Sequence, residues 1–354
     1  MKVVVTGATG NIGTALLRTL AHDGWHVVGV ARRRPNTARA PYRSVHWVEV
    51  DVGSAAAVPA LSEACTGADA VVHLAWAVHP RTDDPPAHRT NVTGSANVLA
   101  ATAAAGVPHL VCASSAGAYA PADRWRRVTE DWPCTGVPGS LYSAHKAALE
   151  SQLDTFTDAH PHLRVARIRP CGVAQPDAAA ELAGWLLSPW LPRTALGHRW
   201  LPLPLWPGLR LQVVHADDVA RAIRLALTAT ATGPFNLAAE PLLNARDLAA
   251  AMRGVRLPVP LPVLRGAAWA AWRAGLQPLH PGWLRLADRA SLVDPTRARE
   301  QLGWTPHHHA ADVVTELVEA IRDRRHGPGP PLRPSRRIHF GHPTHQDQTP
   351  STIQ

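Results

Sequence analysis

The chain has 354 residues, 46% of them hydrophobic, and a formal net charge of +9. This length is sufficient for one large α/β domain with a smaller second lobe. A membrane span is excluded, because the Leu- and Trp-rich segment 255–276 is interrupted by Arg265 and Arg273. Four scattered cysteines without paired spacing, and a strand pattern where a secretory leader would lie, indicate reduced thiols and a cytoplasmic location.

The positive charge does not by itself indicate nucleic-acid binding. Only two of the 36 basic residues are lysines, and Ala and Pro are abundant, a bias that resembles a GC-rich coding sequence. No segment interleaves aromatic and basic residues in the way that nucleic-acid-binding modules do. We therefore expect a small-molecule substrate as the partner, and no nucleic acid.

The first thirteen residues have the pattern of a dinucleotide-binding turn. Residues 3–5 are β-branched without polar alternation, which predicts a buried strand. Thr-Gly-Ala-Thr-Gly-Asn-Ile-Gly follows at 6–13 and leads directly into an apolar-spaced helix. Gly7 permits the tight turn, Gly10 lets the backbone approach a pyrophosphate, and Gly13 lets helix and strand pack closely. The amide groups at the start of the helix then favour an anion.

The second and third predicted strands, 26–30 and 45–50, end in residues placed to contact an adenosine. Arg32 and Arg33 follow the second strand, where an acidic residue would accept a hydrogen bond from the ribose 2′-hydroxyl of NAD. Arginine instead favours the 2′-phosphate of NADP, and a solvated basic loop is the alternative. Asp51, after the third strand, is placed to accept from the adenine amino group or to cap the helix that follows.

The fourth and fifth predicted strands, 70–74 and 109–112, end beside the expected cofactor and substrate. Ala75, after the fourth strand, is small enough for a cofactor to lie over the strand end, whereas Trp76 is larger than that role needs. Ser115 follows the fifth strand. Hydroxyl groups at the carboxyl end of a central strand lie where ligands bind in this architecture.

Tyr142 and Lys146 form the most informative pair in the sequence. They are four residues apart on a helix expected to extend to about residue 157, so both side chains project from one face. The chain has three tyrosines and two lysines, so this spacing is rare by chance. A compact ammonium beside a phenol lowers the pKa of the phenol towards neutrality, as a general acid/base requires. A surface helix pair is the alternative.

Two further features are less specific. A helix expected at 88–105 carries Asn91, and an asparagine inside a helix is often only solvated. The run His307–His309 does not predict a metal site, because three consecutive histidines cannot converge on one ion from a helix or a strand. We expect a solvated loop there and no bound metal.

The second half of the chain has weaker patterns. A sixth strand at 163–169 is closed by Pro170, and residues 181–209 then become rich in Leu, Trp and Pro. This stretch predicts the core and lid of a substrate lobe, with a dimer surface or a lipid-contacting patch as the alternatives. A further strand is expected at 210–215, and the Pro-, His- and Arg-rich tail from Gly327 should be disordered. Helices are expected at about 179–188, 218–229, 244–252, 261–275, 295–301 and 310–323.

These motifs, in this order, resemble the extended short-chain dehydrogenase/reductases, also called the NAD-dependent epimerase/dehydratase family. The resemblance covers residues 1 to about 322 and includes the turn at 6–13 and the Tyr142-x-x-x-Lys146 pair. It also rests on His73-Leu-Ala75, Asn91-Val-x-Gly, Ser114-Ser115 with Tyr119, Arg169-Pro170, Val214 to Ala220, and Ala298 to Pro306.

The resemblance implies a Rossmann-like fold and a role for each matching residue. Tyr142 is then the general acid/base, Ser115 hydrogen-bonds the reacting oxygen, and Lys146 holds the nicotinamide ribose and tunes Tyr142. Asn91 supports the site through water or backbone. The residues expected to bind NAD(P), with NADP favoured by the two arginines, are Gly7, Gly10, Asn11, Ile12, Gly13, Arg32, Arg33, Asp51, Val52, Leu74, Ala75, Lys146 and Pro170.

Three departures from the family pattern lie near the substrate end. Trp76 replaces the small residue that usually follows His-Leu-Ala, and Ala120 follows Tyr119 where Gly is common. The segment after Pro170 is Cys-Gly-Val-Ala-Gln, without the usual Gly-Pro. These departures leave the substrate open, and the apolar, Trp-rich second lobe favours something less polar than a nucleotide sugar.

The sequence therefore predicts a two-lobed α/β protein. A Rossmann-like, doubly wound parallel sheet takes residues 1–170 and 211–233, a smaller and mostly helical substrate lobe takes 171–210 and 234–322, and 323–354 form a disordered tail. The expected reaction is NAD(P)-dependent hydride transfer at a carbinol or carbonyl carbon, as in an epimerase or dehydratase. The alternatives are an NADPH-dependent carbonyl reductase of a less polar substrate and a non-catalytic dinucleotide-sensing protein. A homodimer is also left open.

Overall fold

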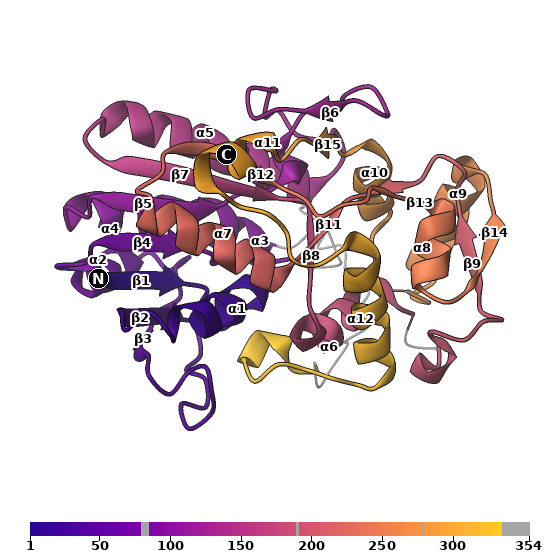
Figure 1. Cartoon of the computed structure of the whole chain (residues 1–354), viewed down its shortest axis with the longest axis horizontal. Helices are drawn as coiled ribbons and strands as arrows, with labels where there is room; N and C mark the ends of the chain where they lie inside the picture. The colour runs from indigo at the N-terminus through magenta and orange to yellow at the C-terminus, as the bar shows by residue number, and fades with distance from the viewer. Residues whose placement is uncertain (79–84, 189–190, 278, 335–354) are drawn as a thin grey trace, which may run out of the picture.

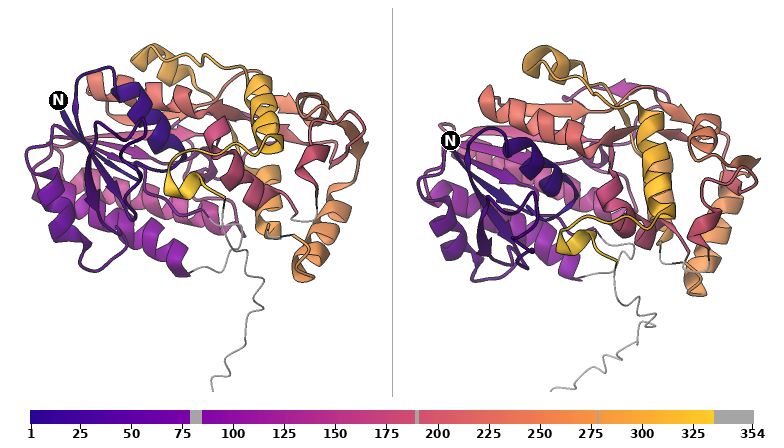
Figure 2. Two further views of the ribbon diagram at one scale, coloured as in Figure 1. Left: turned by 90° about the horizontal axis from the view of Figure 1, so that it is seen from below. Right: turned by 60° about the horizontal axis from the view of Figure 1, so that its bottom comes forward.

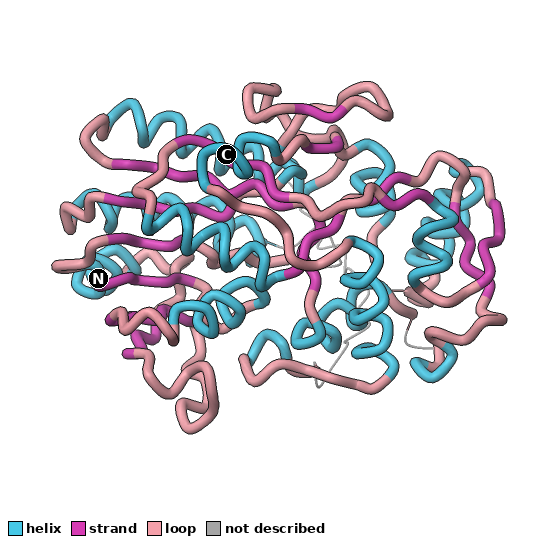
Figure 3. Tube along the Cα trace, in the orientation of Figure 1, coloured by secondary structure: helices cyan, strands magenta, loops and turns pink. Residues whose placement is uncertain are grey.

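A computed structural model describes residues 1–78, 85–188, 191–277 and 279–334, which form two lobes side by side (Figure 1). The first lobe is built around a parallel sheet, and the second is assembled from helices and short strands (Figure 3). None of the helices in these ranges is long and apolar enough to cross a membrane.

The first lobe contains a seven-stranded sheet whose neighbouring strands all run parallel. In spatial order the strands are β12 (Gly233–Leu237), β7 (Arg164–Pro170), β5 (His109–Ala113), β4 (Ala70–His73), β1 (Lys2–Thr6), β2 (His26–Ala31) and β3 (His46–Glu49). The chain order reverses between β1 and β4, and ligands of doubly wound sheets bind at the carboxyl ends beside such a point. The predicted fold class is confirmed.

The core of this lobe follows from strand residues that point alternately to the two faces of the sheet. In β1, Val3 and Val5 join the core cluster on one face, whereas Val4 joins the cluster on the other. The first cluster includes residues of α1 (Asn11–Leu20) and α7 (Ala216–Thr228), and the second includes residues of α2 (Ala57–Cys65), α4 (Gly94–Ala104) and α5 (Leu141–Ala159). Because both faces are covered, the strand needs no polar alternation.

The second lobe is mostly helical. Its helices are α6 (Ala179–Leu186), α8 (Ala245–Ala251), α9 (Leu261–Arg273), α10 (Pro281–Arg289) and α12 (Ala310–Arg322). Three strand pairs accompany them: β8 (Gly172–Ala174) with β11 (Val213–His215), β10 (Arg210–Leu211) with β13 (Leu243–Asn244), and β9 (Pro202–Leu205) with β14 (Val255–Pro258). The strand expected at 210–215 is thus two short strands with different partners.

Two contacts of the first lobe extend past the predicted boundary between the lobes. β12 pairs with β7 in the central sheet, so the first lobe continues to Leu237 instead of ending at residue 233. Ala298 and Leu302 of α11 (Thr296–Leu302), together with Trp304, also belong to the core cluster of the first lobe. The chain therefore returns to the first lobe after it has formed most of the second, a long-range contact that local sequence patterns do not encode.

The segment after α12 also differs from the prediction. Disorder was expected from residue 323, but residues 323–334 run back from α12 towards the first lobe (Figure 2). A 3-10 turn at Pro330–Leu332 buries the Leu332 side chain completely. One apolar side chain with a place to pack thus orders a segment whose composition predicts disorder. The rest of the predicted tail, 335–354, lies outside the described residues.

Candidate active site

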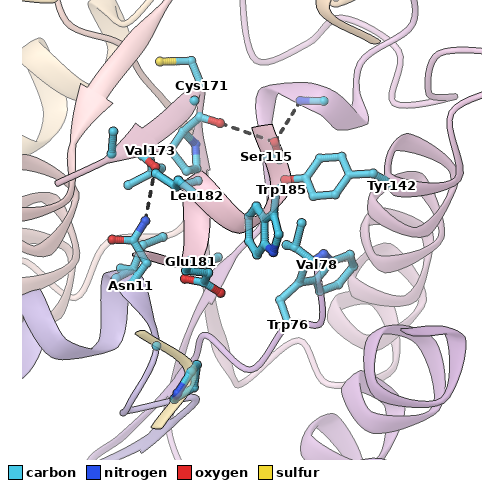
Figure 4. Close-up of a pocket in the computed structure, with 18 of the residues that line it drawn as sticks. Asn11, Trp76, Val78, Ser115, Tyr142, Cys171, Val173, Glu181, Leu182 and Trp185 are labelled. Atoms are coloured by element: carbon cyan, nitrogen blue, oxygen red, sulfur yellow. Dashed lines mark hydrogen bonds between the residues drawn. The ribbon is translucent and has the colours of Figure 1, made fainter. Parts of the chain in front are cut away.

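A cavity of about 1150 Å³ passes the carboxyl ends of the central strands and continues between the two lobes (Figure 4). Every residue predicted to bind the dinucleotide lines it. Ser115, Tyr142 and Lys146 line its middle part, where residues of the second lobe complete the wall. The structure therefore brings the predicted cofactor and catalytic residues together in one place, with the exception of Asn91.

The glycine turn has the geometry that a dinucleotide needs. Gly7 has a φ of +67°, and a Cβ there would lie 2.6 Å from the backbone nitrogen of Ala75. A Cβ at Gly13 would lie 2.3 Å from the Gly7 oxygen, so only glycine lets the helix pack this closely. α1 begins after Gly10 without a side-chain cap and without an acidic residue in its first turn. Its first amide groups are thus left for an anion, and the turn fits a pyrophosphate.

The same turn is anchored from the second lobe. The Asn11 amide nitrogen donates to the carbonyl oxygen of Val173 at 3.2 Å, a bond drawn in Figure 4. The Gln175 amide nitrogen donates to the Asn11 side-chain oxygen at 2.8 Å, and Gln175 is buried. Sequence reasoning missed Gln175, because its partner lies 164 residues away and leaves no local signal.

At the adenosine end, Arg32 and Arg33 are exposed at the edge of the cavity. One oxygen of the Asp51 carboxylate accepts from the Gly53 amide at 3.0 Å, and the other pairs with Arg89 at 2.9 Å. Asp51 does not cap the following helix, because α2 begins only at Ala57. Its contact with an adenine stays a prediction.

Ser115 and Tyr142 lie together where α5 begins. The Ser140 side chain caps this helix, so Tyr142 stands in the first helical turn. The Ser115 hydroxyl oxygen accepts from the Gly117 amide at 3.0 Å. Burial raises the pKa of Tyr142, and a hydrogen bond with Ser115 lowers it. The net change is upward, so the lowering of this pKa expected from Lys146 is not found.

The Lys146 ammonium is buried against Trp76. Its nitrogen donates to the carbonyl oxygen of Ala113 at 2.9 Å and lies 3.4 Å from the centre of the Trp76 ring, which is a cation–π contact. The Lys146 residue is only 3% exposed, and burial lowers its pKa to about 7. Trp76, one of the departures from the family pattern, therefore forms part of the surroundings of this amine.

Tyr142 is flanked by two tryptophans. The ring centres of Trp76 and Tyr142 are 6.4 Å apart and nearly perpendicular, and those of Trp283 and Tyr142 are 5.3 Å apart. Trp185 of α6 lines the same cavity (Figure 4). Sequence reasoning missed Trp283, because a helix that starts with Pro281 and a glycine reads as a loop. Proline is nevertheless well tolerated in the first turn of a helix.

The wall that the second lobe contributes is mainly apolar. Among the described residues, the charged members of this wall are Glu181 and Arg210. Burial raises the pKa of Glu181 to about 7, and burial lowers the pKa of Arg210. Apolar members include Leu182, Trp185, Leu186, Trp283, Leu286 and Leu317. The first part of the stretch 181–209 thus contributes to the wall of this cavity.

Asn91 lies beside the cavity and acts on it through a loop. The expected helix at 88–105 is interrupted by a π-helical turn at Arg89–Thr93, which carries Asn91. The Asn91 side-chain oxygen accepts from the Ala77 amide at 2.7 Å, and its amide nitrogen donates to the Ala77 carbonyl oxygen at 2.9 Å. Asn91 therefore holds the backbone of Ala77, which follows Trp76 in the chain.

Two features singled out in the sequence lie away from the cavity. The Tyr119 hydroxyl is buried and donates to the side-chain oxygen of Asn236 at 2.7 Å. The backbone amides of His307 and His308 donate to the Asp218 carboxylate at 3.0 and 3.1 Å. Within the described ranges, no group of three or more His, Cys, Asp or Glu residues is placed to hold a metal ion.

The chain is similar to known proteins in both sequence and fold. The model of a family described as NAD dependent epimerase/dehydratase matches residues 3–238. An uncharacterised protein of Mycobacterium tuberculosis is 30% identical over 331 residues, covering 92% of this chain, but this chain spans only 30% of that relative. A UDP-glucose 4-epimerase of Mycolicibacterium smegmatis is 28% identical over 334 residues, covering 92% of this chain and 99% of the relative. MoeE5 in complex with UDP-glucuronic acid and NAD has a TM-score of 0.66 at 24% identity, covering 92% of this chain and 100% of the other, a likeness of fold.

Proposed function

Because the chain belongs to the NAD dependent epimerase/dehydratase family, we propose that it transfers a hydride at a carbinol or carbonyl carbon of a small molecule. Tyr142 is the general acid/base of this proposal, and NAD(P) is the cofactor. One observation carries it: Ser115, Tyr142 and Lys146 line the same cavity as the uncapped glycine turn. A dinucleotide with its pyrophosphate at that turn has room to extend along the strand ends towards these three side chains.

The role of each side chain follows from its surroundings. The Ser115 hydroxyl accepts from Gly117, shares a hydrogen bond with Tyr142 and makes a long contact of 3.5 Å to the carbonyl oxygen of Pro170, and it can turn its hydrogen to a substrate oxygen placed beside Tyr142. Tyr142 gives its proton to that oxygen during reduction and takes it back during oxidation. The Lys146 ammonium stabilises the phenolate formed and holds the nicotinamide ribose. The nicotinamide supplies or accepts the hydride.

An NADPH-dependent carbonyl reductase of an apolar substrate is the second candidate. The exposed pair Arg32 and Arg33 at the cavity edge suits a 2′-phosphate, and the wall around Trp185 and Trp283 suits an apolar substrate body. An epimerase or dehydratase returns the hydride to the same substrate, so its cofactor can stay bound throughout. The mycobacterial relative named UDP-glucose 4-epimerase favours this first branch.

The nicotinamide carried by the purified protein distinguishes the two branches. Freshly purified protein would be denatured, and any released dinucleotide would be identified by chromatography and absorbance. Near-stoichiometric NAD⁺ would support the epimerase or dehydratase branch and would contradict the NADP preference inferred from Arg32 and Arg33. An empty protein that binds NADPH more tightly than NADH would support the reductase branch.

Replacement of Tyr142 by Phe tests the acid/base assignment. Phe keeps the ring beside Trp283 but removes the proton that the reacting oxygen needs, so kcat should fall by roughly 10²–10⁴-fold. The measurement is hydride transfer with the fastest substrate from a panel of UDP-sugars with NAD⁺ and aromatic ketones with NADPH. The affinity for the dinucleotide should stay close to that of the wild type.

Tyr119→Phe is the matched control, since it removes a buried phenolic hydroxyl away from the cavity. This control should lower stability and retain activity. An active Tyr142→Phe variant would contradict the assignment. A wild-type protein that binds a dinucleotide yet transfers no hydride to any member of the panel would favour the sensing alternative.

A further inference from the structure

Residues 326–333, here called the C-terminal strap, lie against the glycine turn. After α12 ends, the chain turns back towards α1, and both views of Figure 2 show this path. The Gly327 amide donates to the carbonyl oxygen of Asp177 at 2.7 Å. The 3-10 turn Pro330–Leu332 follows and is closed by a bond of 3.0 Å from the Leu332 amide to the Gly329 oxygen.

The strap packs on the turn without space for a larger residue. A Cβ at Gly329 would lie 2.2 Å from the backbone oxygen of Thr9 and 2.7 Å from the Tyr42 hydroxyl. Gly329 has a φ of −68°, which any residue adopts, so the restriction comes from the neighbouring atoms alone. Thr9 belongs to the glycine turn, and the Tyr42 hydroxyl lies 2.9 Å from that of Thr14 in α1. The strap therefore contacts the segment that is shaped for a pyrophosphate.

Two further contacts hold the strap in this position. Leu332 is completely buried, and the 3-10 turn that carries it lies against α6 of the second lobe. Asp177, which accepts the bond from Gly327, pairs through its carboxylate with Arg18 of α1 at 2.6 Å. The strap is thus joined to both lobes, and lifting it would expose Leu332 to water.

The strap forms a wall of the cavity and does not fill it. Pro330 and Pro331 line the same cavity as Gly10 and Arg32, and this cavity measures about 1150 Å³ with the strap in place. The two prolines offer no backbone N–H groups to a ligand, so they enclose it without competing with the amides of the turn. A ligand seated along the turn would therefore lie between α1 and the strap.

We propose that the C-terminal strap is the outer wall of the dinucleotide site and limits the rate at which a bound dinucleotide leaves. This inference rests on the proposed function, since it takes NAD(P) as the ligand of the glycine turn. A dinucleotide can depart only after Gly329 has separated from Thr9 and Leu332 has left its pocket. Slow release suits an enzyme that keeps its cofactor, whereas a reductase on this fold opens the strap in each turnover.

Gly329→Ala in the full chain tests the proposal directly, because its methyl group meets backbone atoms that cannot move aside cheaply. NADPH would be bound to the protein and then displaced by excess NADP⁺, with nicotinamide fluorescence recorded over time. We expect the dissociation rate to rise about tenfold or more in this variant. Gly266→Ala is the matched control, since a Cβ at this position of α9 has no neighbour within 4 Å.

A pair of shortened chains provides an independent measurement. A chain that ends at Arg325 lacks the strap and should release NADPH as fast as Gly329→Ala or faster. A chain that ends at Pro334 keeps the strap and should behave as the full chain does. Thermal unfolding of each variant separates an opened strap, which leaves the first lobe folded, from a general loss of structure.

Each result decides between the proposal and an alternative. A dissociation rate in Gly329→Ala that changes by less than about twofold overturns the proposal. An NADPH association rate that rises while the dissociation rate stays unchanged also overturns it. The strap would then block entry to the empty site and would not retain the bound dinucleotide. A full chain that binds none of NAD⁺, NADH, NADP⁺ and NADPH would instead contradict the proposed function itself.

Discussion

The carboxyl group of Glu181 stands in the cavity wall without a hydrogen-bond or ion-pair partner among the described residues (Figure 4). Burial is the cause that raises its pKa to about 7, because the charged form loses its hydration there. A carboxyl group that titrates near neutrality inside a candidate active site is available to donate or accept a proton. No local sequence pattern reports this burial, since it depends on how the second lobe folds around α6.

Glu181→Gln should stabilise the protein at the pH values where the buried Glu181 carboxyl group is charged. The folded-state pKa of about 7 lies above the ordinary value of 4.5, so the stability that Glu181 contributes is present below pH 4.5 and is lost as the pH rises through 7. The variant should therefore unfold with a free energy higher by roughly 1–3 kcal/mol above pH 7, and with little change below 4.5.

Urea titrations on both sides of this window measure the difference. Glu63→Gln serves as the matched control, because it makes the same chemical change at an exposed position on α2. A difference between Glu181→Gln and the wild type that is equal at both ends of the window would contradict the assigned titration.

Among the elements, the π-helical turn at Arg89–Thr93 links the helix layer to the cavity. Asn91→Ala removes both bonds to the Ala77 backbone and should lower the free energy of unfolding by about 1–3 kcal/mol. It should also loosen Trp76 from Lys146. Since the chain has only two lysines, acetylation of Lys146 relative to Lys2, read by mass spectrometry, reports this directly. We expect the ratio of the two acetylation rates to rise several-fold.

Asn97→Ala on the same helix layer is the matched control. Its amide also donates to two backbone oxygens, those of Val52 and Ser54, at 2.8 and 3.0 Å, but it does not touch the loop of Trp76. If Asn97→Ala lowers the stability as much as Asn91→Ala but leaves the acetylation ratio unchanged, then Asn91 positions Trp76 over Lys146. A general loosening of the protein would raise the ratio in both variants. An unchanged ratio in Asn91→Ala would show that Trp76 does not depend on this turn.

The elements that depend on residues close together in the sequence could be predicted. The elements that depend on contacts between distant segments could not. Residues 3–5 and the glycine turn form β1 and the start of α1 because all the required information lies within thirteen residues. The π-helical turn at Arg89–Thr93 was missed because its partner, Ala77, is brought there only by the fold. α10 was missed because Pro281 and the next glycine suggest a loop when the packing of Trp283 is unknown.

At the scale of the whole molecule, the sequence predicts the residues that the first lobe contributes to the site. It does not predict the residues that the second lobe contributes. The glycine turn, Ser115, Tyr142 and Lys146 belong to motifs whose spacing is visible in the sequence. Trp283 and the C-terminal strap reach the same cavity, and Gln175 anchors the glycine turn beside it, through contacts between segments far apart in the chain. Such contacts depend on how the lobes pack, and a single sequence carries no period or spacing that reports it.

The segment that leads from Trp304 into α12 contacts the buried carboxylate of Asp218. Asp218 of α7 is only 1% exposed and accepts from the backbone amides of His307 and His308 at 3.0 and 3.1 Å and from Arg221 at 2.9 Å. Its backbone oxygen also accepts from the indole nitrogen of Trp304 at 2.8 Å. Asp218 thus joins the core of the first lobe to the segment that leads into α12, so we expect the two lobes to unfold together.

Asp218→Asn should weaken this junction while it preserves the size of the side chain. Its amide group places an N–H donor against backbone amides that need acceptors, which should cost about 2–4 kcal/mol of unfolding free energy. Far-UV circular dichroism and tryptophan fluorescence should still record one coincident thermal transition, shifted to lower temperature. Asp312→Asn, exposed in the first turn of α12, should shift it little. Two separate transitions in the wild type would contradict the coupling, because the lobes would then be joined by chain alone.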